Sequence, residues 1–382
     1  MASNSMQDDG PTYSGSKMLL LSYCKNTLSE IGMQKEEAQG NDQKEIILNV
    51  YHSKCSSLIT EITSLDDEAL SFVVLTNLLQ KIAQLVLDFT YVEECCLVDQ
   101  DFLLQAAYER VTYIIETLSS IERLTTEVAP DNHLRDLVSP SIAECIHWRK
   151  GALLYMYCHT VNSRCGREQL PSHFLQCLQN GSKHLIAMLS TRSSPVWLSP
   201  ASDSMDEASG VDTGSSIDQS EMLLSQGIYS DTHLLALMYL GEMCYWYAQL
   251  TQPSPSCDQI PGAGHNVRGD NNPSADTTAS GDNWPSVQQG DATVGTSPST
   301  GEVGDKVDLS PGLSCAASFS QCQTEVSGPS LSLQQGQSLD MLRVGQSCLE
   351  NYISAAKGPM SAGGWSTDRA EEILQYFGNL TI

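Results

Sequence analysis

The sequence is poor in basic residues: 20 Lys and Arg stand against 46 Asp and Glu, which gives a formal net charge of -26 at pH 7. A surface with this charge repels the phosphates of nucleic acids and of anionic lipid headgroups. We therefore expect no nucleic acid partner. Any contact with a membrane is expected to be indirect or to use a small basic patch.

Long apolar runs are also missing, since none approaches the roughly 20 residues that span a bilayer. Direct membrane insertion is therefore not expected. The first residues, MASNSMQDDGPTYSGSK, are polar and acidic, whereas a secretory signal is basic and then apolar. The expected location is cytoplasmic, in the cytosol, where the 13 cysteines would stay reduced and act as small core residues.

The common catalytic signatures are missing as well. We find no Walker-type phosphate loop, no G-x-G-x-x-G after a strand, no H-E-x-x-H and no G-x-S-x-G. No C-x-x-C pair occurs, and the adjacent Cys158 and His159 would point about 100° apart on a helix. We expect no cofactor, metal or catalytic residue. A helical metal or haem enzyme that uses Cys158, His159 or His233 is kept as a less favoured alternative.

No segment alternates apolar and polar residues with period two, so strands are not expected. Apolar residues recur instead every three or four positions, which is typical of amphipathic helices. The clearest such stripes are Ile47, Tyr51, Cys55, Leu58 and Ile62; Leu70, Val74, Leu78, Ile82, Leu85 and Phe89; and Val111, Ile114, Leu118 and Ile121. The pattern predicts an all-α fold.

Two helix starts can be placed by their caps. Ser64, followed by Asp66 and two further acidic residues, is expected to cap one helix, because a hydroxyl accepts from free backbone N–H groups and acidic side chains suit a helix start. Ser139 is expected to cap another, with Pro140 at its first helical position.

Composition divides the chain further. Residues 193–220 contain no Lys or Arg, and residues 251–335 consist largely of Gly, Ser, Thr, Pro, Asn, Gln and Asp, which bury too little apolar area to fold. We predict one helical-bundle-like domain with a long disordered internal insertion. Its parts are a disordered tail over 1–16, the first part of the core over 17–192, an acidic linker over 193–220, a central buried helix within 221–250, a disordered acidic insertion over 251–335, and C-terminal helices over 336–382 that dock on the core.

The stretch WRKGALLYMYCHT, from Trp148 to Thr160, and a second one from His233 to Leu250 are apolar on nearly all sides of a helix. A helix of this kind is normally buried. Each has a glycine in its interior, Gly151 and Gly241, and such a glycine costs about 1 kcal/mol relative to alanine. We therefore expect another backbone to approach closely at both glycines.

Both stretches carry aromatic side chains, and the first also carries the basic pair Arg149 and Lys150. Core packing is the favoured interpretation of the aromatic ones, and a partner groove is the alternative, because aromatic residues and arginine are enriched at interfaces. The basic pair is expected at a solvated helix end, or against an acidic partner. The candidate helix-crossing or partner-contact positions are Trp148, Arg149, Lys150, Gly151, Tyr155, Gly241, Tyr245 and Trp246.

Three stretches together resemble one family: LDFTYVEECCLVDQDF from Leu87, ECIHWRKGALLYMYCHT from Glu144 and LLSQGIYSDTHLLALMYLGEMCYWY from Leu223. They are similar to the Rab-interacting Mon-Ccz complex subunit family. The resemblance spans most of the expected helical core and leaves out the tails, the linker and the insertion. It transfers no catalytic or binding residue.

The resemblance implies a cytosolic, non-enzymatic subunit of the Mon-Ccz guanine nucleotide exchange complex, with that complex and the late-endosomal Rab GTPase as partners. It also implies a role in placing and stabilising this Rab on damaged mitochondria, and so in mitophagy. A different binding function stays open, because Trp148, Gly151 and Tyr155 loosely echo a tetratricopeptide helix. That alternative is a helical adaptor for an unrelated peptide.

Overall fold

The computed structural model describes residues 15–38, 40, 42–66, 70–103, 106–192, 223, 228, 230–252 and 340–380. Within these ranges every regular element is helical, so the all-α prediction is confirmed. The predicted tail before residue 15, the linker over 193–220 and nearly all of the predicted insertion over 251–335 lie outside the described residues. The helices are α1 (Ser16–Glu37), α2 (Asp42–Ser64), α3 (Phe72–Asp99), α4 (Ala107–Val128), α5 (Leu134–Val138), α6 (Pro140–Arg164), α7 (Phe174–Leu189), α9 (Asp231–Thr251), α10 (Met341–Lys357) and α11 (Asp368–Leu380), with short 3-10 turns η1 (Arg167–Gln169) and η3 (Ser361–Gly363).

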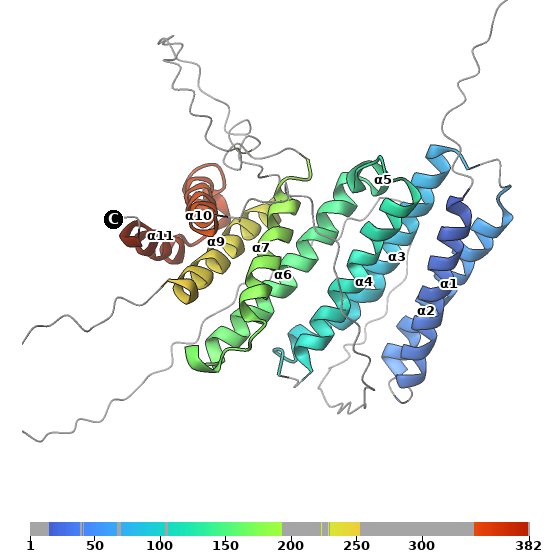
Figure 1. The fold of residues 1–382 in the computed structure, drawn as a ribbon, viewed down its shortest axis with the longest axis horizontal. Coiled ribbons are helices and arrows are strands. Elements are labelled where there is room, and N and C mark those ends of the chain that lie inside the picture. Colours follow the sequence, from blue (N-terminus) through green and yellow to red (C-terminus); the bar gives the residue numbers. More distant parts are fainter. Residues whose placement is uncertain are drawn as a thin grey trace, which may run out of the picture. The chain divides into compact units, whose positions relative to one another are not determined.

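The helices pack mainly as antiparallel hairpins that lie side by side (Figure 1). The hairpins are α1 with α2, α3 with α4, and α6 with α7, and α9 packs on α10. Neighbouring hairpins meet through α1 and α2 against α4 and α3, α4 against α6, and α7 against α9, while α11 covers α9 and α10. This arrangement places α6 and α9 inside the packed helices.

Local chemistry explains where two of these helices begin. The Ser139 hydroxyl accepts from the backbone N–H of Ile142 at 3.5 Å and Pro140 occupies the first turn of α6, so this predicted start is confirmed. The predicted start at Ser64 is wrong, because Ser64 ends α2. The cap of α3 is Ser71, whose hydroxyl accepts from the N–H of Val74.

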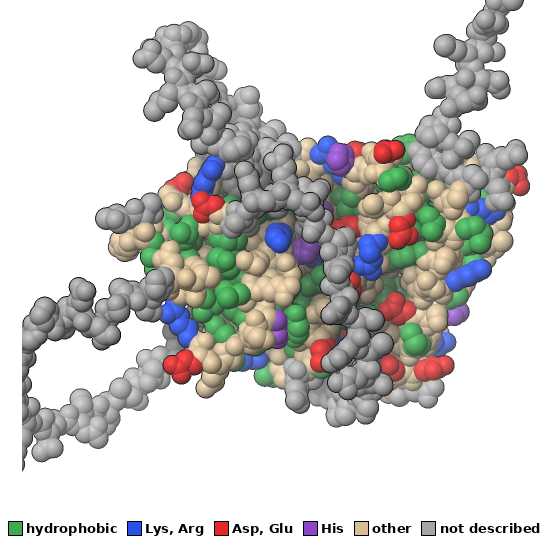
Figure 2. All heavy atoms as spheres, viewed as in Figure 1, with side chains coloured by type: hydrophobic (Ala, Val, Ile, Leu, Met, Phe, Trp, Pro, Cys, Tyr) green, Lys and Arg blue, Asp and Glu red, His purple; other side chains and the backbone are tan. Residues whose placement is uncertain are grey.

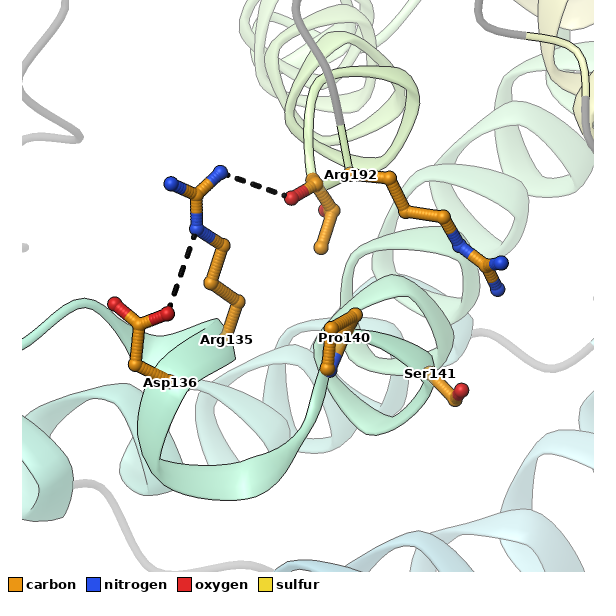
Figure 3. Close-up of a pocket in the computed structure, with 6 residues that line it drawn as sticks. Arg135, Asp136, Pro140, Ser141 and Arg192 are labelled. Atoms are coloured by element: carbon orange, nitrogen blue, oxygen red, sulfur yellow. Dashed lines mark hydrogen bonds and ion pairs between the residues drawn. The ribbon is translucent and has the colours of Figure 1, made fainter. Parts of the chain in front are cut away.

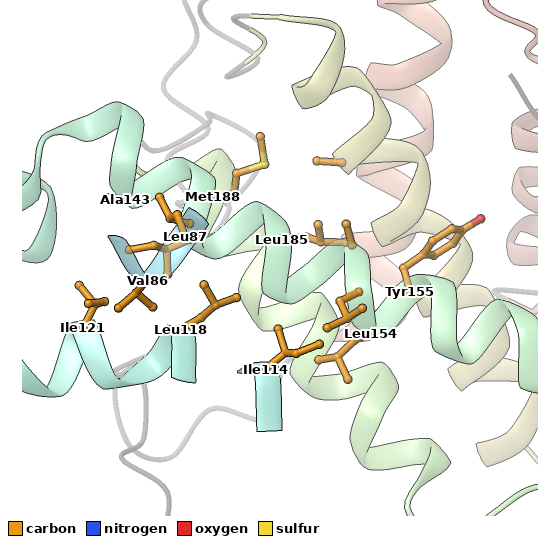
Figure 4. Packing of buried hydrophobic residues seen from close by; sticks show 14 of the residues in the cluster. Val86, Leu87, Ile114, Leu118, Ile121, Ala143, Leu154, Tyr155, Leu185 and Met188 are labelled. Carbon is orange, nitrogen blue, oxygen red and sulfur yellow. The ribbon is translucent and has the colours of Figure 1, made fainter. Parts of the chain in front are cut away.

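The core is continuous through the hairpins, and Figure 4 shows its centre. Ile114 and Leu118 lie one turn apart on α4 and are fully buried against the neighbouring helices. Leu154 of α6 and Leu185 of α7 are equally enclosed. The C-terminal helices belong to the same compact unit, which comprises Met1–Ser254 and Ser338–Ile382.

One described helix, α3, is long and apolar enough to cross a membrane by length and composition. No continuous apolar run causes this; the mean hydropathy of its best window, 1.4, averages over interspersed polar residues. A core helix passes the same test, and α3 packs on α2, α4, α5 and α6. Its charged side chains pair with those neighbours: Asp88 with Lys54, Glu93 with Lys44, and Glu94 with Arg149.

The charges that reach the surface are mixed in sign over α1–α4 on the face that Figure 2 shows, with hydrophobic side chains between them. Fewer charged side chains lie over α7, α9 and α10 on this face. Ion pairs between helices account for part of the mixing, as in Lys81 of α3 with Glu61 of α2 at 2.6 Å. Exposed pairs of this kind contribute only about 0–1 kcal/mol each.

Candidate functional site

Helix α6 carries five of the eight candidate positions and packs on α3, α4, α5, α7 and α9. Its side chains therefore meet other helices in almost every direction. Trp148 and Arg149 are half-buried, and Lys150, Gly151 and Tyr155 are buried. The neighbourhood of α6 and α9 is the candidate site whose geometry follows.

Arg149 holds α6 against α3. Its guanidinium binds Glu94 through two hydrogen bonds of 2.9 and 2.6 Å and donates to the Leu87 carbonyl at 2.6 Å and the Thr90 hydroxyl at 2.9 Å. Burial raises the pKa of Glu94, and the charge of Arg149 offsets part of that rise. Because these bonds use the planar fork of the guanidinium, Arg149 here joins two helices and does not lie at a solvated helix end.

Lys150 lies in the interior, with 0% of its side chain exposed. Its Nζ is 2.8 Å from Oε1 of Glu122 on α4, and Nδ1 of His147 is 3.5 Å from the same oxygen. The ring of His184 on α7 stacks near His147, with centroids 6.4 Å apart. The sequence-based expectation of a solvated helix end therefore does not describe Lys150, which joins α4, α6 and α7 in one buried polar cluster.

Burial controls the titration of this cluster. It lowers the pKa of His147 to about 4, with Glu122 opposing and Lys150 adding to the shift. It also lowers the pKa of His184, helped by the charge of Lys150, and lowers the pKa of Lys150 itself, against the attraction of Glu122. Both imidazoles are consequently neutral near pH 7.

Glycines mark the closest contacts between the central helices. A Cβ at Gly151 would lie 2.6 Å from Cδ2 of Leu185 on α7, and one at Gly241 would lie 2.4 Å from Cδ2 of Leu349 on α10. Two further glycines, Gly181 of α7 and Gly345 of α10, are equally tight, the first against Met243 and the second against Cys244. Neither Gly181 nor Gly345 is among the eight candidate positions, although each lies inside a helix.

Stacked aromatic rings connect α6 to α9. Tyr155 lies between two residues of α9: its ring centroid is 3.8 Å from that of Tyr239 and 5.6 Å from that of Trp246. Trp148 stacks on the other part of the same row, 5.7 Å from Tyr239. Offset stacks of this kind add about 0.5–1.5 kcal/mol beyond the buried area. These rings contact one another within the described chain.

A buried carboxylate extends this row to α11. Tyr155 donates its hydroxyl to Glu242, and Arg369 of α11 lies 3.3 Å from the same carboxylate. The Arg369 guanidinium also lies over the Tyr245 ring, 5.2 Å from its centroid, and Tyr376 meets that ring edge-on. Tyr245 thus contacts the C-terminal helix.

A second buried carboxylate, Glu144 of α6, contacts one residue just after α7 and one in the first turn of α9. Arg192, just beyond α7, binds Glu144 through Nε and Nη2, the latter at 2.8 Å. His233, in the first turn of α9, has Nε2 3.7 Å from Glu144, and its Nδ1 is 2.9 Å from the hydroxyl of Ser230. Burial lowers the pKa of His233, with Glu144 opposing.

An open pocket lies beside Arg192 (Figure 3). Its volume is about 490 Å³ and it is lined by Arg135, Asp136, Pro140, Ser141, Thr191 and Arg192. Both arginines already have partners, since Arg135 donates to the Thr191 carbonyl at 3.1 Å and lies 3.8 Å from Asp136. The charged side chains that line the pocket are therefore already paired with other residues of the chain.

The three side chains proposed for a helical metal or haem enzyme lie apart and contact different groups. Cys158 is buried beside Cys177, His159 lies near the Trp246 ring at the surface, and His233 faces Glu144. Among the described residues, no group of three or more His, Cys, Asp or Glu side chains is placed to hold a metal ion.

The arrangement around α6 therefore joins helices through a buried salt bridge, close glycine contacts and stacked rings. Comparison with known proteins shows to which family the chain is related. A family model described as RAB7A-interacting MON1-CCZ1 complex subunit 1 matches residues 51–281 and 314–378. No solved structure matches this chain.

Relatives in three vertebrates carry the same name, RAB7A-interacting MON1-CCZ1 complex subunit 1. The human protein is 30% identical over 90% of both chains, and the mouse protein is 31% identical over 79% of this chain and 78% of its own. The zebrafish (Danio rerio) protein is 38% identical over 45% of this chain and 58% of its own length. The chain belongs to the RAB7A-interacting MON1-CCZ1 complex subunit 1 family.

Proposed function

We propose that this chain is a non-catalytic subunit that binds the MON1–CCZ1 complex and the GTPase RAB7A. The proposal is carried by one observation, the 30% identity that extends over 90% of both this chain and the human relative. The name of that relative states both partners. The family model covers residues 51–281 and 314–378, which include α3 to α10 and most of α11.

The geometry agrees with a scaffold. The conspicuous polar side chains of α6 and α9, including Arg149, Lys150, Glu144 and Glu242, are engaged by neighbouring helices. They contribute to the rigidity of the packed helices, and the outer faces present the area for partners. Nucleotide exchange is, in this proposal, left to MON1–CCZ1.

The site of action is a further part of the proposal. The chain resides in the cytosol and reaches late endosomes or damaged mitochondria through its partners, where it supports the recruitment and stability of RAB7A in endolysosomal traffic, autophagy and mitophagy. Its net charge of -26 supports an indirect route, because anionic lipid surfaces repel such a chain. The family resemblance supports the choice of membranes.

Binding is tested with the purified full chain and a purified MON1–CCZ1 heterodimer of the same species, by size-exclusion chromatography and biolayer interferometry. Co-elution and saturable binding are expected. In cells, depletion of the chain is expected to lower the amount of RAB7A on mitochondria after depolarisation, and re-expression is expected to restore it. A chain that neither binds the heterodimer nor alters RAB7A recruitment would refute the proposal.

A second candidate, an adaptor for an extended peptide, is favoured by one observation: the helices are stacked as successive antiparallel hairpins. Stacked helix pairs build the peptide-binding surfaces of several repeat proteins. Peptide-array binding that persists in cells lacking MON1 and CCZ1 would support this candidate over the first one.

A further inference from the structure

The C-terminal helix α11 is held against the other helices by few side chains. Among the described elements it packs mainly on α9 and α10 (Figure 1). Its buried residues are Ala370, Ile373 and Phe377, whereas twelve residues of α9 are buried. We call the surface that α11 covers the α11 seat, and its key residues are Glu242 and Tyr245 of α9 and Gly345 of α10.

Phe377 fits the α11 seat because Gly345 has no side chain. A Cβ at Gly345 would lie 3.0 Å from Cζ and 3.1 Å from Cε2 of the Phe377 ring. The same ring meets Tyr245 edge-on, with centroids 6.4 Å apart. Phe377 is 2% exposed, so the largest apolar side chain that α11 inserts depends on this glycine.

One charge contact decides which helix the α11 seat accepts. Nε of Arg369 lies 3.3 Å from Oε1 of Glu242, and the guanidinium lies over the Tyr245 ring, 5.2 Å from its centroid. Glu242 is 8% exposed, so an apolar helix without a cation would bury this carboxylate without its charge partner. The α11 seat therefore favours a helix with an arginine four positions before an isoleucine and eight before a phenylalanine.

Both charged groups keep a partner when α11 leaves its seat. The carboxylate of Glu242 still accepts from the hydroxyl of Tyr155 on α6. Arg369 keeps Glu372 of its own helix, since Nη1 donates to Oε2 of that residue at 2.7 Å. Separation thus leaves neither charge alone, whereas an uncompensated buried charge is what makes the breaking of such pairs costly.

The connection from Gly358 to Thr367 between α10 and α11 is long enough to open. Its ten residues span at most about 33–36 Å when extended. One hydrogen bond ties it to α10, from the Tyr352 hydroxyl to the Ser366 carbonyl at 2.8 Å. The pair of Lys357 with Glu371 is well exposed on both sides and contributes little. An extended connection can therefore carry α11 to another molecule.

We infer that the α11 seat binds α11 of a second copy of this chain, so that two copies exchange their C-terminal helices. The occupant is identified by its fit, because the helix that fills the seat carries the required arginine, isoleucine and phenylalanine, and every copy has it. The exchanged dimer repeats the contacts of the closed monomer and needs no new interface. This assembly goes beyond the proposed function, which concerns other proteins.

Concentration and salt set the amount of dimer. A short connection gives α11 an effective concentration of about 1 mM at its own seat, so the monomer is expected to dominate at micromolar concentrations. Two copies also repel each other, since each has a net charge of -26. Salt screens this repulsion. The dimer fraction is therefore expected to rise with both protein and salt concentration.

Sedimentation velocity of the full-length chain tests the inference. Samples from about 10 µM to about 1 mM, which reach the effective concentration of the seated helix, are held in mild urea and returned to buffer of low or high salt. Phe377→Glu is expected to form at least tenfold less dimer than the unchanged chain, because its carboxylate cannot be buried at Gly345. Val73→Glu is the matched control, since Val73 is 75% exposed on α3, and it is expected to dimerise like the unchanged chain.

Two outcomes overturn the inference. One is a chain that stays monomeric over the whole range, and the other is a dimer that persists in Phe377→Glu, because it would use another surface. Far-UV circular dichroism establishes that the variants are folded. Arg369→Glu, which sets a second carboxylate against Glu242, takes the place of Phe377→Glu if that variant does not fold.

A labelled peptide with the sequence of residues 364–382 supplies a second measurement, by fluorescence anisotropy. It is titrated with full-length Phe377→Glu, whose own α11 no longer fills the seat. The peptide is expected to bind at least tenfold more tightly than the same peptide with Phe377→Ala. Equal affinity of the two peptides, or no binding of either, overturns the inference.

Discussion

Replacing Gly151 by alanine tests whether α6 and α7 meet as closely as the structure shows. The matched change is Gly32→Ala in α1, where an added Cβ would have no heavy atom within 4 Å. At Gly151 the Cβ would lie 2.6 Å from Cδ2 and 3.2 Å from the backbone nitrogen of Leu185, a fully buried residue. The two substitutions are chemically identical and differ in what surrounds them.

The magnitudes follow from two opposing effects. Alanine favours a helix interior over glycine by about 1 kcal/mol, so Gly32→Ala is expected to raise the free energy of unfolding by about that amount. Overpacking a dense core costs about 1–3 kcal/mol, so Gly151→Ala is expected to be neutral or to lower the free energy of unfolding by up to about 2 kcal/mol. Gly151→Leu would add three carbon atoms more and is expected to disrupt folding before it affects partner binding.

Urea denaturation followed by circular dichroism at 222 nm measures both variants against the unchanged chain. In a domain of this size, about 1 kcal/mol corresponds to a shift in melting temperature of about 2–4 °C. If Gly151→Ala stabilised the protein as much as Gly32→Ala does, the close approach at this position would be refuted. A Gly151→Leu variant that is folded but has lost only partner binding would equally contradict the argument.

Three further predictions concern the buried charges. Arg149→Ala is expected to lower the free energy of unfolding by about 3–5 kcal/mol, because it leaves the carboxylate of Glu94 buried without its partner; urea titration measures this, and a loss under 1 kcal/mol would contradict it. Lys150→Met is expected to lower the free energy of unfolding by less than Arg149→Ala does, because Oε1 of Glu122 is buried but the Glu122 side chain as a whole is 26% exposed, against 14% for Glu94; a loss as large as that of Arg149→Ala would count against this reasoning. Stability is expected to fall as the pH falls from 6.5 towards 4, because His147 is protonated in the unfolded chain over this range but stays neutral in the folded one, where its pKa is about 4. The loss is at most about 3 kcal/mol at 1.36 kcal/mol per pKa unit. Urea titrations at several pH values measure it, and His147→Gln is expected to reduce the pH dependence.

The fold class could be predicted from the sequence because apolar spacing in these helices is regular and local. The start of α6 was also predictable, since Ser139 and Pro140 form a cap that depends on adjacent residues alone. The start of α3 was misplaced for a related reason. Ser64 and Ser71 both precede helix-forming residues, and the choice between them depends on where α2 ends against α1 and α3.

The roles of Arg149 and Lys150 depend on contacts far along the chain and could not be predicted. Nothing in the WRKG stretch indicates that Glu94 and Glu122, each at least 28 residues earlier in the sequence, would approach from two different helices. The basic pair therefore suggested a helix end. A signal was nonetheless present, because a cation within a helix that is apolar on nearly all sides requires a buried partner.

The meeting of Arg192 and His233 at Glu144 has a consequence for chains that are cut. Arg192, just after α7, and His233, in the first turn of α9, both contact Glu144, so the two ends of this interval are held at one carboxylate by contacts of the folded helices. A protease that cleaved the chain between Arg192 and Ser230 would thus yield two fragments that stay associated and elute together under native conditions. The chain can accordingly be divided between Arg192 and Ser230 into two fragments, or a reporter fragment or an affinity tag can be inserted there.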